Sequence, residues 1–256
     1  MPLLFLLAFI QEMKRLSTNK LLIERREQML TVEKLQEKLE SFQDKDQAVQ
    51  MEKYMRNQFP FLGVKTPERR KAVINALGQT RKPDFQVIKP LVEQLWLLPE
   101  REYQNAALDL LGRVKQFPKE AIALIEQLIV TKSWWDTVDS LAVHSAGKYF
   151  KQHPDQIYFI SEKWMTSENM WLNRSAILFQ ISYKEKTDWP LLKRSILVHS
   201  ESKEFFIQKA IGWALREYSK TAPSTVKNFI GEASLEPLSK REASKIIKKN
   251  EQERQK

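Results

Sequence analysis

A pattern that recurs about every 35 residues constrains the fold of this chain more than any other feature. Aromatic residues open three segments, at residues 133–135, 170–174 and 205–209. Trp135 and Trp171 are 36 positions apart, and Trp171 and Phe206 are 35 apart. Paired helices with a period of about 35–45 residues are typical of α-solenoids of the HEAT or armadillo kind. We therefore predict an all-α solenoid of HEAT-like repeats that forms one curved domain with a concave basic groove.

The rest of the sequence also favours helices over strands. The chain has six glycines, no Asn-Gly or Asp-Gly turn, and no sustained alternation of polar and apolar residues. Thr66 precedes Pro67 and Glu68, which predicts a capped helix start at Thr66. Other prolines mark further boundaries, at positions 83, 118, 154, 190, 223 and 237. We expect roughly a dozen helices from Thr31 onward, mostly joined by short loops.

Charge and composition limit the possible partners and cofactors. The 256 residues carry a net charge of +10, which favours DNA, RNA or an anionic membrane surface, although a soluble protein with a well-charged surface has the same property. The absence of cysteine excludes disulfides, thiolate nucleophiles and zinc sites that use cysteine. His144, His153 and His199 are scattered and read as structural or surface residues. We therefore expect no metal and no cofactor.

The composition divides the chain into three parts. Residues 1–30 form an N-terminal extension whose apolar stretch is too short to span a bilayer. We interpret it as a result of start-site choice, with translation beginning at Met29, or as a loose helix. Residues 31–250 form the repeat domain, and residues 251–256 a basic and polar tail. From Pro237 onward basic residues outnumber acids, which suits a solvated tail or a phosphate-binding arm.

Residues 133–139 (SWWDTVD) place two tryptophans and two acids inside this basic chain. Trp135 and Asp139 are four positions apart, so they share one face of a helix. An aromatic face beside a carboxylate suits a flat, cationic group. One member of each aromatic pair is expected to point into the core, and we assign Trp134, Trp171 and Phe205 to it.

Several long strings in the chain resemble those of the AlkD-like DNA glycosylases, a bacterial DNA alkylation repair family. They are residues 57–70 (NQFPFLGVKTPERR), 97–102 (LLPERE), 131–140 (TKSWWDTVDS), 171–180 (WLNRSAILFQ), 202–213 (SKEFFIQKAIGW) and 238–243 (LSKREA). The resemblance runs in order from about Val32 to Lys249. It leaves residues 1–30 outside, which agrees with the interpretation of that segment as an extension.

The resemblance implies a curved stack of HEAT-like repeats that grips duplex DNA. It also implies hydrolysis of the N-glycosidic bond of positively charged alkylpurines, such as 3-methyladenine and 7-methylguanine, without a metal or organic cofactor. The family's catalytic positions fall on Trp135, Asp139, Arg174 and Trp213. We predict DNA contacts from Tyr54, Thr66, Arg70, Arg174, Lys203, Lys209 and Arg216.

The chemistry of these residues agrees with that implied activity. A cationic purine is already a good leaving group, so a carboxylate such as Asp139 has only to stabilise the sugar cation and orient water. Trp135 and Trp213 would offer aromatic faces to the cationic base. Arg174 would hold a backbone phosphate through its planar guanidinium. Taken without the resemblance, Asp139 and Arg174 read equally well as surface charges, and Trp213 as a core residue.

We therefore predict a monofunctional DNA glycosylase in the bacterial cytosol, associated with the nucleoid when bound to DNA. Its partner would be double-stranded DNA that contains alkylated bases; we expect a monomer with no membrane partner. A second hypothesis is a non-catalytic repeat protein that binds distorted or branched DNA. A third is a solenoid that binds other proteins.

Overall fold

The helices begin where the sequence supplies a capping side chain or a proline. The computed structural model describes residues 31–78 and 80–254. Asp44, Asn169 and Asp188 each accept a hydrogen bond from the backbone of the first helical turn that follows. Proline lies in the first turn of four α-helices, where its missing N–H costs nothing. The predicted cap at Thr66 is wrong by one position, because Lys65 is the cap residue and makes no side-chain capping bond.

Helices account for all the regular structure in the described residues, and no strand occurs there. The N-terminal half contains α2 (Val32–Glu40), α3 (Lys45–Tyr54), α4 (Thr66–Leu77), α5 (Phe85–Leu97), α6 (Arg101–Arg113), α7 (Ala121–Val130) and α8 (Trp135–Ser140). A π-helical segment, η1 (Leu141–Ala146), joins α8 to α9 (Gly147–Gln152). The C-terminal half contains η2 (Pro154–Gln156), α10 (Ile157–Met165), α11 (Met170–Leu178), η3 (Lys184–Lys186), α12 (Trp189–Val198), α13 (Phe205–Tyr218), α14 (Pro223–Glu232), α15 (Pro237–Ala243) and α16 (Lys245–Arg254).

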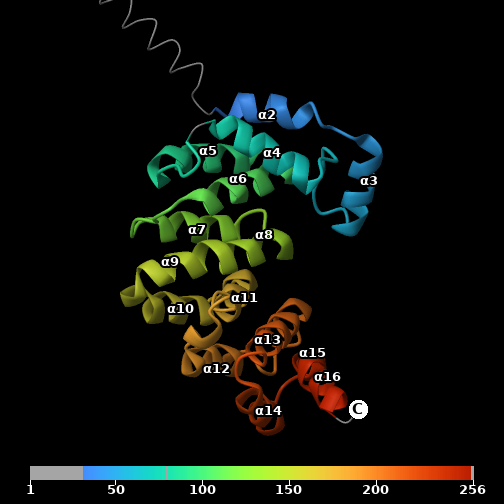
Figure 1. The fold of residues 1–256 in the computed structure, drawn as a ribbon, viewed down its shortest axis with the longest axis vertical. Coiled ribbons are helices and arrows are strands. Elements are labelled where there is room, and N and C mark those ends of the chain that lie inside the picture. Colours follow the sequence, from blue (N-terminus) through green and yellow to red (C-terminus); the bar gives the residue numbers. More distant parts are fainter. Residues whose placement is uncertain (1–30, 79, 255–256) are drawn as a thin grey trace, which may run out of the picture.

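The helices stack along the long axis of the molecule, from α2 at one end to α12–α16 at the other (Figure 1). One row consists of α4, α6, α8, α11, α13 and α15, and each of these helices contacts the next. The other helices lie beside this row; α5 packs on α6, and α10 packs on α11. We call the row from α4 to α15 the inner row, because all the predicted catalytic residues lie on it. The prediction of an all-α solenoid is confirmed.

Hydrogen bonds repeat along the solenoid in the same way as the sequence pattern. Gln104, Asn173 and Gln208 lie in the first turns of α6, α11 and α13. Each donates its side-chain amide to the carbonyl six positions earlier, over distances of 2.7, 2.9 and 3.1 Å respectively. These bonds fix the angle at which the chain enters each inner helix. Inner helix α6 is therefore part of the repeat, although the aromatic pattern did not identify it.

The loop between α3 and α4 is attached to the start of α6. Buried Glu102 accepts hydrogen bonds from the backbone N–H groups of Leu62, Gly63 and Val64, at 2.9–3.0 Å. Gly63 has a φ of +86°, and a Cβ there would lie 1.9 Å from the carbonyl oxygen of Asp44. Only glycine fits this position. The loop thereby sets where α3 and the start of α4 lie relative to the inner row.

Two hydrophobic clusters fill the interior. The first extends from α2 to the start of α12, and the second from the π-helical segment to α15. They meet around α11, where Ala176 belongs to the first cluster and Ile177 to the second. The N-terminal extension predicted for residues 1–30 lies outside the described residues.

Candidate active site

Helix α8 carries two acids that are held by helices on opposite sides. Asp139 is paired with Arg174 of α11, and Asp136 with Arg101 of α6. Trp134 precedes the helix in an extended conformation, so Trp135 is the first helical residue. Trp135 and Asp139 line the same hollow, as their spacing of four predicts. The local sequence thus presents one aromatic ring and one carboxylate together.

Arg174 binds the Asp139 carboxylate with both of its parallel donor groups. Nε donates to Oδ1 and Nη2 donates to Oδ2, each over 2.7 Å. Nη1 donates to the backbone oxygen of Phe206. Arg174 is 4% exposed, so the reading of this residue as an ordinary surface arginine is wrong. The pair gives Asp139 a fixed orientation, because a two-point bond restrains both position and rotation.

The four predicted catalytic residues lie together around a hollow of about 270 Å³, which we call the catalytic hollow. Its lining residues are Trp135, Asp139, Arg174, Phe205, Phe206, Lys209, Trp213 and Arg216. They come from α8, α11 and α13, three successive helices of the inner row. Trp213 also packs against the second hydrophobic cluster, as expected for a core residue. The same side chain lines the catalytic hollow.

The Asp139 carboxyl is subject to opposing electrostatic effects. Burial raises its pKa above the usual value, and the nearby Asp136 carboxylate acts in the same direction. The hydrogen bonds and positive charge of Arg174 lower the pKa and so limit the rise. Arg174 therefore favours the ionised form of a carboxyl that burial alone would tend to neutralise.

Arg101 is a structural counterpart of Arg174 that sequence reasoning missed. Its Nε and Nη2 donate to the two oxygens of Asp136 over 3.0 and 2.7 Å, and Nη1 donates to the Lys132 carbonyl. Its guanidinium lies 3.9 Å from the centre of the Phe59 ring. Arg101 and Asp136 are 35 positions apart, as are Arg174 and Asp139. This spacing equals the period of the repeat, and it is the feature of the sequence that could have indicated both ion pairs.

An aromatic cluster adjoins the catalytic hollow through Phe206, which also lines it. Trp134, Trp171 and Phe206 contact one another with ring centroids 5.1–6.0 Å apart. The core assignments of Trp134 and Trp171 agree with this cluster. The assignment of Phe205 is wrong, because Phe205 is 52% exposed and Phe206 takes the inward place. The apolar face of α13 that packs into the core begins at Phe206, one residue later than the aromatic pattern suggested. This sets the rotation of the helix about its axis.

A second hollow, of about 600 Å³, lies on the other side of Trp135. Three predicted DNA contacts line it, namely Tyr54, Thr66 and Arg70. The Tyr54 ring meets the Trp135 ring edge-on, with centroids 5.9 Å apart. Trp135 is thus shared by both hollows, which places these residues next to the catalytic hollow.

One acid of α15, Glu242, holds the two predicted DNA contacts on α13. Lys209 and Arg216 both pair with Glu242, at 3.2 and 2.8 Å, and both line the catalytic hollow. Lys203 lies apart from this group. It pairs with Glu236 and its side chain is 82% exposed, and it lines neither of the two hollows.

The chain is similar to proteins of a known family and to solved structures. The sequence profile of a family described as DNA alkylation repair enzyme matches residues 35–247. A solved structure from Enterococcus faecalis, described as a predicted DNA alkylation repair enzyme, is 36% identical. The alignment covers 79% of this chain and 95% of that one, with a TM-score of 0.74. This chain belongs to the DNA alkylation repair enzyme family.

Two Streptococcus mutans structures share the fold of this DNA alkylation repair family member. They are smu.31 of strain UA159 and AlkD2, each 20% identical, with TM-scores of 0.55 and 0.56. Each alignment covers 78% of this chain and 97% of the other. No curated protein sequence matches the chain. The resemblance inferred from the sequence strings is confirmed by the family match.

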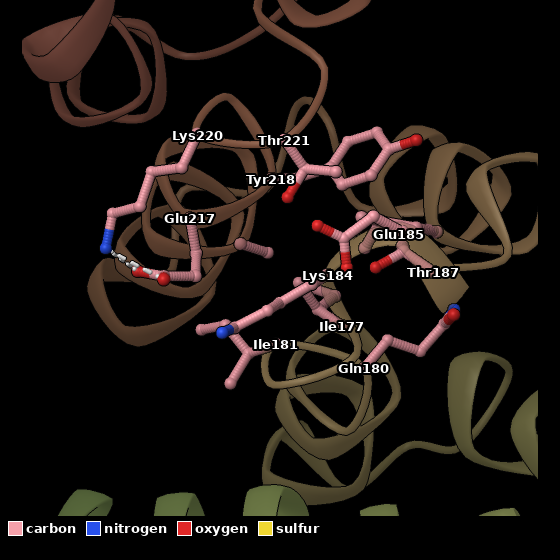
Figure 2. Close-up of a pocket in the computed structure, with 12 residues that line it drawn as sticks. Ile177, Gln180, Ile181, Lys184, Glu185, Thr187, Glu217, Tyr218, Lys220 and Thr221 are labelled. Atoms are coloured by element: carbon pink, nitrogen blue, oxygen red, sulfur yellow. Dashed lines mark hydrogen bonds and ion pairs between the residues drawn. The ribbon is translucent and has the colours of Figure 1, made fainter.

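A separate cavity of about 270 Å³ lies between η3 and the C-terminal end of α13 (Figure 2). Glu185 and Tyr218 line it, and Lys220 pairs with Glu217 at its edge. None of the predicted site residues of this family member lines this cavity. We therefore do not assign the activity to it.

Residues 31–78 and 80–254 contain no group of three or more His, Asp or Glu side chains placed to hold a metal ion. His153 and His199 each bond a backbone carbonyl oxygen, of Phe117 and Met165 respectively. Within the same part of the chain, no helix is long and apolar enough to cross a membrane.

Proposed function

We propose that this DNA alkylation repair family member is a monofunctional DNA glycosylase that excises positively charged alkylpurines from duplex DNA. The substrates would be of the 3-methyladenine and 7-methylguanine type. One observation carries the proposal: a carboxylate fixed by a buried arginine lies in a hollow with two tryptophans. Family membership supplies the context of DNA repair.

Asp139 would stabilise the positive charge that develops on the sugar as the glycosidic bond breaks. A fixed, partly desolvated carboxylate does this more effectively than a mobile one in water. The cationic base leaves as a neutral purine, so the reaction needs no general acid. Asp139 can also orient the water that attacks the sugar.

Trp135 and Trp213 would bind the cationic base or its sugar. Attraction between a cation and an aromatic face contributes roughly 0.5–2 kcal/mol per ring. A neutral, undamaged purine lacks this attraction, which gives the hollow a basis for selectivity. The hollow would form part of a concave basic surface along the inner row.

We propose that Arg174 acts mainly by positioning Asp139, rather than by phosphate contact as its sequence suggested. Three of its N–H donors already bond Asp139 and Phe206. Phosphate contact would then fall to the more exposed cations. Tyr54, Thr66, Arg70, Lys209, Arg216 and Lys203 remain proposed DNA contacts.

The test is release of free base from duplex DNA that carries 7-methylguanine. Asp139→Asn should reduce release by about 100-fold or more, because it removes the stabilising charge and keeps the size. DNA affinity should stay the same or rise slightly, since a negative charge near phosphate is lost. Asp155→Asn is the matched control, because Asp155 is a solvent-exposed acid paired with Lys119 and remote from the hollow.

Each unfavourable outcome points to a different alternative. Tight DNA binding without base release by the wild type would support a non-catalytic DNA-binding protein instead. Equal loss of binding and release in Asp139→Asn would show that Asp139 is structural. No binding to duplex DNA at physiological salt would favour a solenoid that binds proteins.

A further inference from the structure

A third hollow, of about 520 Å³, lies beside the candidate active site between α4, α6 and the α8–η1 helix. The lining residues that matter here are Arg70, Asn105, Asp109, Arg113, Ser140 and His144. Ser140 follows Asp139 directly in the chain. The third hollow also shares Arg70 and Asn105 with the hollow that contains Tyr54. The hollow that contains Tyr54 therefore adjoins both of the others, and α8 contributes lining residues to all three.

Four polar side chains of the third hollow have no protein partner. Asn105, Arg113, Ser140 and His144 make no side-chain hydrogen bond or ion pair with the residues that the structure describes. Asn105, Arg113 and Ser140 are half-buried and His144 is exposed, so all four donors are open to solvent or to a ligand. Four free donor groups that line one hollow indicate a ligand rich in acceptor atoms.

The charge of the hollow specifies an anion. Three arginines line it, and the only acid among the lining residues is Asp109. Asp109 is already bound by Arg69 at 2.8 Å and approached by Arg70 at 3.5 Å. Arg113 is thus left without a countercharge, and Arg70 is largely exposed. An anion in the hollow would face an uncompensated positive field.

The lining also argues against a nucleobase. No Trp, Tyr or Phe borders this hollow, whereas aromatic rings border both of its neighbours. Bases that have left the duplex stack bind proteins largely by stacking on aromatic rings, and phosphates bind through arginine and neutral N–H or O–H donors. The donors that line the third hollow are of the kind that binds phosphate.

We propose that this hollow binds a backbone phosphate of duplex DNA, immediately next to the nucleotide that faces Asp139. Arg113 supplies the charge, and Asn105, Ser140 and His144 supply neutral donors. Because Ser140 adjoins Asp139, a phosphate held there fixes the register of the damaged strand against the carboxylate. This inference rests on the proposed function for the identity of the ligand as DNA.

The experiment measures binding of an undamaged duplex over a range of salt, from about 50 to 200 mM. Each phosphate neutralised by a cation contributes about −0.9 to the slope of log K against log salt. Arg113→Gln keeps most of the side-chain length and removes the charge, so its slope should be shallower than that of the wild type by about 0.9. Arg113→Lys should restore the slope.

Arg194→Gln is the matched control. Arg194 is also a partly exposed arginine, but it lies on α12 and pairs with Glu162 of α10, away from the three hollows. The Arg194→Gln substitution removes the same charge from the molecule. It should leave the slope of log K against log salt unchanged, and base release as well. A slope for Arg113→Gln equal to that of Arg194→Gln overturns the proposal.

A neutral donor gives an independent test. Asn105→Ala should weaken binding several-fold with an unchanged slope, because it removes a hydrogen bond and no charge. Unchanged affinity in Asn105→Ala would overturn the assignment of Asn105 as a phosphate donor, whatever the slope measured for Arg113→Gln. The measurement does not require excision, so failure of the wild type to release base would reject the glycosylase proposal and leave this test intact.

Discussion

At the residue scale, the main determinant of the site is the bond between Asp139 and Arg174. A carboxylate used for electrostatic stabilisation must be both desolvated and ionised, and burial opposes ionisation. Arg174 reconciles these requirements by binding both carboxylate oxygens at 2.7 Å. Both residues were recognisable from the sequence strings, but their pairing was not, because the two lie on different helices.

This pair predicts a specific pH dependence for base release. In the proposed mechanism the ionised form of Asp139 is the active one, and burial places its pKa above the usual value for aspartate. Base release should therefore fall as the pH is lowered through that raised pKa. Arg174→Gln removes a favourable positive charge, so the pKa should rise further and the acid limb should move to higher pH.

Single-turnover release of 7-methylguanine as a function of pH measures this effect. Lys209, Arg216 and Asp136 also face the site and are unchanged in the variant. Rates are corrected for spontaneous base loss. A variant with reduced release but the same acid limb as the wild type would mean that Arg174 does not control the ionisation of Asp139.

At the element scale, ion pairs of one buried acid, Glu242, hold α15 against α13. Glu242 pairs with Lys209 and Arg216 of α13 and with Lys245 of α16. A Cβ on Gly212 would lie 2.4 Å from the Glu242 Cβ, so the two helices are in direct contact. Glu242 therefore determines where the two cations of the catalytic hollow point.

We expect Glu242→Gln to lower the free energy of unfolding by about 1–2 kcal/mol at neutral pH. The hydrogen bonds from Lys245 and Lys209 lower the pKa of Glu242 to about 2, from an ordinary value of 4.5. A lowered pKa stabilises the fold above pH 4.5, and this contribution is lost as the pH falls towards about 2. The difference between wild type and variant should therefore narrow over that range.

Urea unfolding at a series of pH values provides the measurement. Glu236→Gln serves as the control, because Glu236 makes one ion pair with the exposed Lys203 and should contribute little. A constant difference between Glu242→Gln and the wild type across the acid range would contradict the assigned role of the carboxylate.

At the scale of the whole molecule, the solenoid has two hydrophobic clusters that meet at α11. Repeat proteins gain stability mainly from contacts between neighbouring units, so the two ends need not unfold together. The catalytic hollow draws α8 from one side of this junction and α13 from the other. Its geometry therefore depends on the packing of both clusters.

Two matched substitutions test this division of the core. Leu215→Ala opens a cavity in the second cluster, and Leu110→Ala opens one in the first. Each should cost about 2–5 kcal/mol. Native-state hydrogen exchange should increase in α12–α15 for Leu215→Ala and in α4–α7 for Leu110→Ala. Equal increases along the whole chain in both variants would show a single cooperative unit instead.

The sequence by itself determined the all-helical class, most helix starts and the repeat, because these follow from local signals. Prolines and capping side chains act within a few residues, and the period of about 35 residues reflects one packing unit copied along the chain. The strings around Trp135, Asp139, Arg174 and Trp213 also indicated the family. Each of these features can be recognised without knowing which helix faces which.

Only the tertiary structure decided which side chains meet. It placed Phe206 inward instead of Phe205, buried Arg174 against Asp139, and revealed Arg101 as the partner of Asp136. These outcomes depend on the rotation and spacing of helices some 35 positions apart, which are set by packing of the core over the whole stack. Local sequence patterns carry no direct information about that rotation.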